Sequence, residues 1–242
     1  MSGRLADQSC LDGADGPTLA TLERSFEAHR ILRHPFLENL RQKRFTRRQI
    51  AIWVSQQFWF SRQFPRCLAA LYARIDDWEA SRPIVGMLGI EHWGAPRPDA
   101  HWAQFADVLP FFGLSLDGLA RSAPLPETAQ YLDTRLAMCL RATPEEALGV
   151  VAFAHELVNT QIFAAYLEGV RRLPEVPGPA LAYFESHVRD ESEDYAILRR
   201  IMQRLCVTPG SRRLLEKGGL EALEARCAFF DRIQERVQGA GA

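Results

Sequence analysis

The chain has 242 residues, of which 47% are hydrophobic and 24% are charged. These are the proportions of an ordinary globular protein, and they exclude a disordered or fibrous one. Twenty-nine Lys and Arg residues against thirty Asp and Glu give a formal net charge of −1, so charge offers no case for a nucleic acid or an anionic membrane as partner. No uncharged stretch is long enough to span a bilayer, and the N-terminus lacks the apolar core of a signal peptide, so we expect a cytoplasmic protein.

Helical signals dominate the chain, and no segment alternates apolar and polar residues as a strand does. Pro and Gly positions, capping residues and apolar spacing place the helix boundaries. In the first half of the chain we expect helices over 17–29, 47–74 and 79–93, with a short helix after His34-Pro35 and another that is capped by Asp99 and carries His101 toward Pro110. In the second half we expect a short helix from Ser115 and longer ones over 126–141, 144–172 and 179–206. A last helix follows a break at Pro209-Gly210 and ends near Val237.

The sequence predicts one all-α domain over residues 17–238, with a flexible segment at 1–16 and a frayed tail at 239–242. Thr143-Pro144-Glu145-Glu146 is the clearest local signal, because Thr143 and Glu146 form a capping box around a first-turn proline. The five cysteines are an odd number and include no Cys-x-x-Cys pair. We therefore expect reduced, mostly buried thiols, without a disulfide framework or a zinc site.

Acidic and histidine side chains interrupt several apolar stretches. His187, Glu191 and Asp194 fall on one helical stripe that is apolar on either side, and Glu156 lies in the least polar stretch of the chain. Such groups are expensive to bury unless they are paired or bind a metal. Asp190 and Glu193 lie off the stripe, and we expect them to be solvated.

Two further candidates end one helix and begin the next, namely Glu91 and His101. Together the six positions offer four carboxylates and two imidazoles, a donor set that suits iron or manganese and that builds dinuclear sites in helical bundles. The alternative, left open by the spacing, is a buried network of ion pairs with Arg62, Arg66, Arg189 or Arg199. The two Glu-x-x-His pairs of ferritin-like proteins are absent from the sequence.

Several motifs resemble the haem-oxygenase-like helical superfamily over roughly residues 34–234. They are His34-Pro35-Phe36, Phe45-Thr46-x-x-Gln49-Ile50, Phe64-Pro65-Arg66, Glu91 with His101-Trp102-x-x-Phe105, and Tyr183-Phe184-x-x-His187. This superfamily includes pyrroloquinoline-quinone synthase C, the TenA thiaminases, a chlamydial p-aminobenzoate-forming protein and non-haem di-iron oxidases. The resemblance implies a haem-oxygenase-like helical bundle and a homodimer. Phe111, Phe112, Leu114 and Leu119 are candidates for the dimer interface, although we expect them to pack in the domain's own core.

Carried over from the iron-dependent members, the metal ligands fall on Glu91, His101, Glu156, His187, Glu191 and Asp194. Asp194 stands where the resemblance implies His, a change that would weaken one of the two metal positions, leave a single one, or favour manganese. Cysteine is missing from Phe153-Ala154-His155-Glu156, which argues against a thiaminase. Leu37 and Gln57 stand where the p-aminobenzoate-forming relative uses tyrosines, and the segment from Gln57 to Ser61 is less basic than a quinone pocket.

The resemblance thus implies an O₂-dependent non-haem iron oxidase or oxygenase that holds two Fe(II) per chain and acts on a small amino-acid-like or fatty-acid-like substrate. An external electron donor is a further expected partner. Glu91 and Glu156 are the expected catalytic carboxylates, and the expected substrate-lining residues are Trp53, Gln57, Phe60, Phe64 and Tyr195, with Trp102 beside them. Two alternatives stay open: a metal-free oxidase that uses His34, His92 and Arg62, and a non-enzymatic relative that binds a small molecule.

Overall fold

The computed structural model describes residues 16–42, 44–91 and 101–240, and within these ranges the side chains of Trp102, Asp190 and Glu191 are not described. Those ranges contain helices and no strand. The α-helices are α1 (Leu19–Glu27), α2 (Pro35–Arg41), α3 (Arg47–Tyr72), α4 (Trp78–Glu91), α5 (His101–Val108), α6 (Leu116–Ala120), α7 (Pro126–Arg141), α8 (Pro144–Val151), α9 (Val158–Arg171), α10 (Gly178–Leu205) and α11 (Pro209–Gly239). The all-α prediction is confirmed.

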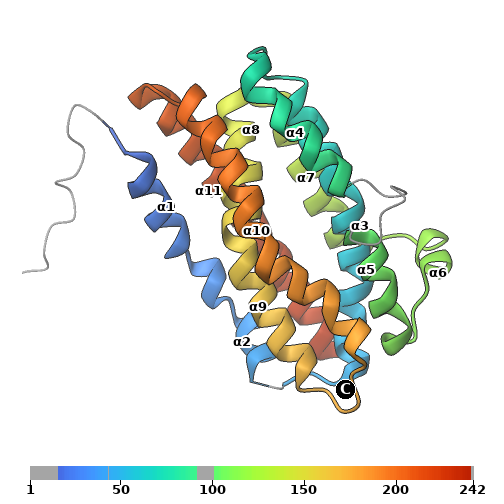
Figure 1. Cartoon of the computed structure of the whole chain (residues 1–242). Coiled ribbons are helices and arrows are strands. Elements are labelled where there is room, and N and C mark those ends of the chain that lie inside the picture. Colours follow the sequence, from blue (N-terminus) through green and yellow to red (C-terminus); the bar gives the residue numbers. More distant parts are fainter. Residues whose placement is uncertain (1–15, 43, 92–100, 241–242) are drawn as a thin grey trace, which may run out of the picture.

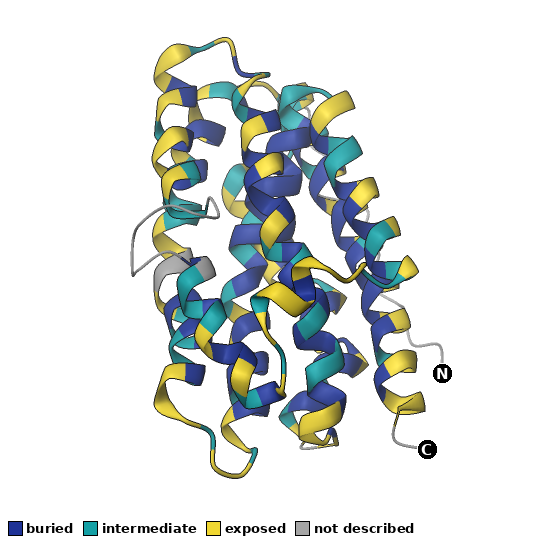
Figure 2. Ribbon diagram, turned by 90° about the vertical axis from the view of Figure 1, so that its right-hand side faces the viewer, coloured by how far each residue is buried: buried dark blue, intermediate teal, exposed yellow. Residues whose placement is uncertain are grey.

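The long helices run side by side as a bundle, and the short α6 lies at its edge (Figure 1). The most extensive contacts join α8 to α11, α9 to α10, and α3 to α7. Figure 2 shows the buried residues on the inward faces of the helices and the exposed ones outside. The apolar spacing of each helix therefore directs one stripe into a shared core, as expected for amphipathic helices.

Capping residues begin the helices where the sequence predicts. Thr46 and Thr143 form capping boxes with Gln49 and Glu146, and Ser115 caps α6. The helix break that was expected at Pro209-Gly210 lies just before Pro209. Pro209 is the first residue of α11, and Thr208 accepts the cap hydrogen bond, because the fixed φ of proline suits the first helical turn.

The expected helix over 144–172 contains a π-helical segment, Ala152–Leu157, between α8 and α9. The whole helical stretch Pro144–Arg171 is long and apolar enough to cross a membrane, yet 78% of its most apolar 18 residues are buried inside the bundle. Its apolar character is therefore explained by its place in the core. Four cysteines, Cys67, Cys139, Cys206 and Cys227, are free and buried as expected, and Cys10 lies outside the described residues.

The aromatic cluster near α6 belongs mainly to the core of the chain. Phe112 and Leu119 are buried, and Phe111 and Leu114 are half-buried against the same core. These residues thus pack as we expected them to in a single chain. Residues 1–15 of the predicted N-terminal segment and the last two residues of the chain lie outside the described ranges. The helix α11 continues through Gly239, two residues past its expected end.

Candidate active site

A small polar cavity lies between α3, α4, the π-helix, α9 and α10. Its volume is about 10 Å³, which is the space that one water molecule needs. Its walls carry both polar and aromatic side chains: Gln57, Phe60, Ser61, Phe64, Glu91, His155, Asn159, Phe163 and His187. Three of the five predicted substrate-lining residues, Gln57, Phe60 and Phe64, are among them.

Glu91 and His187 line this cavity, and His101 contacts both of them. Glu91 Oε1 lies 2.7 Å from His101 Nδ1, and both side chains are about nine-tenths buried. The rings of His101 and His187 are 4.1 Å apart between centroids. The structure thus brings together three of the six predicted metal ligands, from the end of α4, the start of α5 and the middle of α10.

The orientation of His187 is fixed by its own helix. Its Nδ1 donates a hydrogen bond of 2.7 Å to the carbonyl of Tyr183, one turn earlier. Nε2 is therefore the nitrogen that carries the lone pair, which is the usual arrangement of a histidine that binds a metal. Burial lowers the pKa of His187 well below its usual value, with the neighbouring His101 as a second cause, so the ring is neutral.

A hydrogen-bonded polar group lies at the cavity, in which Gln57 and Ser61 line the wall and Tyr183 bonds to both. The Tyr183 hydroxyl lies 3.2 Å from Gln57 Nε2 and 3.1 Å from Ser61 Oγ. These groups are held by α3 and α10, two long helices that pack in the core, so their positions are fixed by the bundle. They offer both donors and acceptors to a polar substrate inside an otherwise aromatic cavity.

The other predicted ligands are placed elsewhere or are not described. Glu156 lines a second, outer pocket of about 510 Å³ beneath α1, together with Glu23 and Tyr195. In that pocket the Tyr195 hydroxyl donates to Glu23, which also accepts from Arg199. Asp194 is half-buried, and Glu191 is outside the described side chains. Within the described residues, no three His, Cys, Asp or Glu side chains are arranged closely enough to hold a metal ion.

Trp53, and the described residues of the metal-free alternative, lie outside the lining of the cavity. Trp53 is buried against Tyr166, with 4.1 Å between ring centroids, and does not line the cavity. His34 caps α2 and bonds to Asp231, and Arg62 lies at a surface groove beside Trp59. His92 lies outside the described residues. Of the four arginines proposed for an ion-pair network, Arg199 pairs with Glu23 in the outer pocket.

His155 is a cavity residue that the sequence analysis did not assign. Its ring stacks on Phe64 at 3.6 Å, and its Nδ1 has no hydrogen-bond partner among the described residues. Burial, followed by the charges of Arg135 and Arg226, holds its pKa well below the usual value. A histidine next to Glu156 in an apolar stretch was the available signal, but spacing alone did not show which of the two faces inward.

The chain is similar to proteins of known name and fold. The TENA/THI-4/PQQC family matches it over residues 24–232. A 4-aminobenzoate synthase of Chlamydia pneumoniae is 26% identical over 203 residues, which cover 81% of this chain and 88% of that protein. A pyrroloquinoline-quinone synthase of Pseudomonas putida is 27% identical over 195 residues, which cover 78% of this chain and 75% of that protein.

Solved structures show the fold. A protein of unknown function with a heme oxygenase-like fold from Shewanella denitrificans superimposes with a TM-score of 0.77 at 15% identity, covering 92% of this chain and 94% of its own. A CADD-like protein from Nostoc punctiforme gives a TM-score of 0.76 at 17% identity, covering 90% of this chain and 96% of its own. The predicted haem-oxygenase-like bundle is therefore confirmed.

Proposed function

The chain belongs to the TENA/THI-4/PQQC family, and from this we propose that it is an oxidase of a biosynthetic pathway, with O₂ as co-substrate and iron as cofactor. Its substrate is a small organic molecule that enters the cavity beside His187. The names of its relatives, two kinds of synthase, support a biosynthetic role.

The observation that carries the proposal is the contact of His101 with Glu91 and His187, two residues that line the cavity. One carboxylate and two imidazoles are the donor set that non-haem iron enzymes use. The chemistry of these donors fits the metal, because His187 is neutral and its Nδ1 is already engaged with a carbonyl. As they stand, these three side chains are not arranged as a metal site, so they would have to close around the ion to hold it. Glu156, Glu191 and Asp194 are the further donors of the proposed set. Bound iron would supply the redox chemistry with O₂ that side chains do not provide.

The protein's own side chains would bind and orient the substrate. The His155 ring stacks on Phe60 and on Phe64, and all three residues line the cavity. Such an aromatic lining suits a flat substrate. Gln57 and Ser61 offer hydrogen bonds that fix its orientation. Most of the residues that line the cavity are buried, so a bound substrate would be largely shielded from bulk water.

Metal analysis tests the proposal. Protein stripped with a chelator is reconstituted anaerobically with Fe(II), and the iron content and O₂ uptake are then measured. We expect bound iron in the wild-type protein and the loss of most of it in His187→Ala and His101→Ala, with an unchanged helical circular dichroism spectrum. His34→Asn is the matched control, because asparagine can still cap α2 and iron binding should persist.

The iron content also shows whether the site holds two irons per chain or one. Close to two irons per chain supports the full donor set with Glu156, Glu191 and Asp194, and about one supports Glu91, His101 and His187 alone. A preference for manganese over iron would point to the extra carboxylates. Wild-type protein that binds neither metal contradicts the iron proposal.

A metal-free oxidase is the second candidate, and the direct contact between Glu91 and His101 favours it. A carboxylate beside an imidazole is a common general-base arrangement, and it requires no metal. This candidate predicts O₂ uptake with a reduced substrate that is insensitive to chelators, and loss of turnover in Glu91→Gln. A protein that binds small molecules but consumes no O₂ with any reductant would contradict both candidates.

A further inference from the structure

Two arginines are buried in the core without a carboxylate partner. Arg135 in α7 and Arg226 in α11 are only 3% and 2% exposed. Their hydrogen bonds go to neutral oxygens: Arg135 donates to Gln63 Oε1 at 3.1 Å and the Phe60 carbonyl at 3.2 Å, and Arg226 to the Ala154 carbonyl at 3.1 Å and Asn159 Oδ1 at 2.8 Å. The ion pairs that the described arginines form do not involve either of these two guanidiniums.

Both guanidiniums also keep an unused donor. Arg135 Nη1 and Arg226 Nε are buried and have no hydrogen-bond partner in the described part of the chain. Arginine stays protonated in proteins, so burial cannot neutralise these groups as it neutralises a histidine. Buried charges are costly unless they are paired, and two of them in one core leave an unbalanced positive region.

This positive region adjoins the cavity. The guanidinium carbons of Arg135 and Arg226 lie 4.0 and 5.1 Å from the ring centroid of Phe60, which lines the cavity. Asn159, the hydrogen-bond partner of Arg226, lines it as well. The two charges therefore lie directly behind residues of the cavity wall.

Two titratable side chains, Cys67 and Tyr131, also lie near Arg135. A hydrogen bond with Cys139, and to a lesser extent the charge of Arg135, lower the pKa of Cys67 to about 7. Burial raises the pKa of Tyr131, so its phenol stays neutral beside Arg135. A single thiolate leaves at least one of the two guanidiniums without a counter-charge.

We propose that Arg226 and Arg135 recognise a carboxylate of the substrate that enters the cavity beside Phe60. This inference rests on the proposed function in one respect, namely that the cavity is the substrate site. A carboxylate is planar and accepts paired hydrogen bonds, which suits the fork of a guanidinium. Because the cavity holds only one water molecule, Phe60 or Phe64 moves when the substrate binds.

Benzoate and its neutral isostere benzamide are the probes that test this. Each is titrated into the iron-free wild-type protein, and binding is followed by calorimetry and by the shift in Tm. We expect benzoate to bind at least about tenfold more tightly than benzamide, as charge-assisted hydrogen bonds imply. Arg226→Met should weaken benzoate about 10- to 100-fold and leave benzamide unchanged. Arg200→Met, in which an exposed arginine of α10 is replaced, is the control and should bind like the wild type.

Three results would overturn the inference: equal binding of the two probes, binding of neither, and a benzoate preference that survives in Arg226→Met. The comparison of the two probes uses the wild-type protein, so it is decisive even if a variant does not fold. No iron is present in the titration, and a failure of the iron proposal therefore leaves this result readable. Conversely, a wild-type protein that binds iron but does not bind benzoate would refute only the carboxylate site.

Discussion

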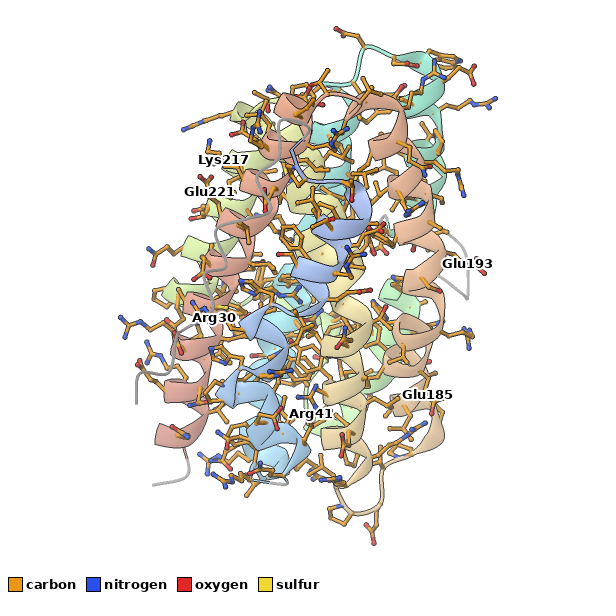
Figure 3. The ribbon with its side chains drawn as sticks, turned by 90° about the vertical axis from the view of Figure 1, so that its left-hand side faces the viewer. Arg30, Arg41, Glu185, Glu193, Lys217 and Glu221 are labelled. Carbon is orange, nitrogen blue, oxygen red and sulfur yellow. The ribbon has the colours of Figure 1, made fainter. Side chains whose placement is uncertain are left out.

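At the scale of single residues, Glu146 shows how one side chain joins two helices. Its carboxylate accepts the amide N–H of Thr143 at 2.8 Å and also bonds to Lys217 of α11. Lys217 and Glu221 follow one another along the outer side of α11 (Figure 3). The hydrogen bond from Lys217, followed by that of the Thr143 amide, holds the pKa of Glu146 below its usual value. The charged form is therefore favoured in the folded protein.

This shift predicts a pH-dependent effect of Glu146→Gln. Because the folded-state pKa is depressed, the stabilisation is present above the unfolded-state pKa of about 4.3 and is lost as the pH falls through the folded-state value. We expect the variant to be less stable by about 1 kcal/mol at neutral pH and equal to the wild type in strong acid. Urea unfolding at both pH values measures this. Glu145→Gln, one residue earlier, is the control, and an equal loss at both pH values would contradict the ionic explanation.

Residues of the cavity could be predicted where they lie on the apolar, inward face of a helix. Gln57, Phe60 and Phe64 lie on the inner face of a long helix, and His187 lies on an apolar stripe, so the sequence pointed at them. Arg226 gave the same signal, because Leu223 and Phe230 lie one turn away on either side and are buried. A single arginine is more often read as a solvated residue, and this is why it was missed. Glu193, expected to be solvated, is exposed and points away from α10 (Figure 3).

At the scale of helices, the contact between α8 and α11 depends on two glycines. A Cβ on Gly218 would lie 2.1 Å from the carbonyl oxygen of Glu146, and a Cβ on Gly149 would lie 2.0 Å from that of Leu215. The two backbones thus touch at a distance that no side chain permits. Glycine is costly inside a helix, so its presence here is explained by the close approach.

Gly218→Ala should therefore separate the two helices and destabilise the protein by about 2 kcal/mol or more. Gly86→Ala is the matched control. It adds the same methyl group inside α4, where nothing lies within 4 Å, and we expect it to stabilise the protein by up to about 1 kcal/mol. The free energy of unfolding of both variants, from urea titration, checks this. If Gly218→Ala were as stable as Gly86→Ala, the two helices could move apart without a loss of stability.

Helix boundaries were predictable because short-range chemistry sets them. Pro126 and Arg141 bound α7 as expected, and the Thr143 and Glu146 box begins α8. The π-helical segment was not predictable. An additional residue in one turn changes no composition or capping signal, and its effect depends on the tertiary packing around it. The sequence therefore indicated that both His155 and Glu156 are buried, but not toward which side.

At the scale of the whole molecule, α11 connects most of the bundle. It packs against α2, α3, α7 and α8, and the buried apolar side chains form one core cluster in the described residues. Such a core unfolds as a unit. We expect one transition in urea, with coincident curves from far-UV circular dichroism and tryptophan fluorescence. Two separated transitions would contradict the prediction of a single domain.

The fold of the whole chain could be predicted from its helical pattern and its motifs, because both are spread over nearly the entire sequence. The ligand set was harder to predict, since it depends on how the end of α4, the start of α5 and the middle of α10 meet. The homodimer, the cytoplasmic location and the electron donor stay predictions.

The π-helix forms part of the wall of both pockets. His155 faces the inner cavity, and its chain neighbour Glu156 lines the hollow beneath α1. The partition between the two compartments is thus a single helical turn, and consecutive residues are its two surfaces. A change in the backbone of this one turn would therefore alter the walls of both compartments.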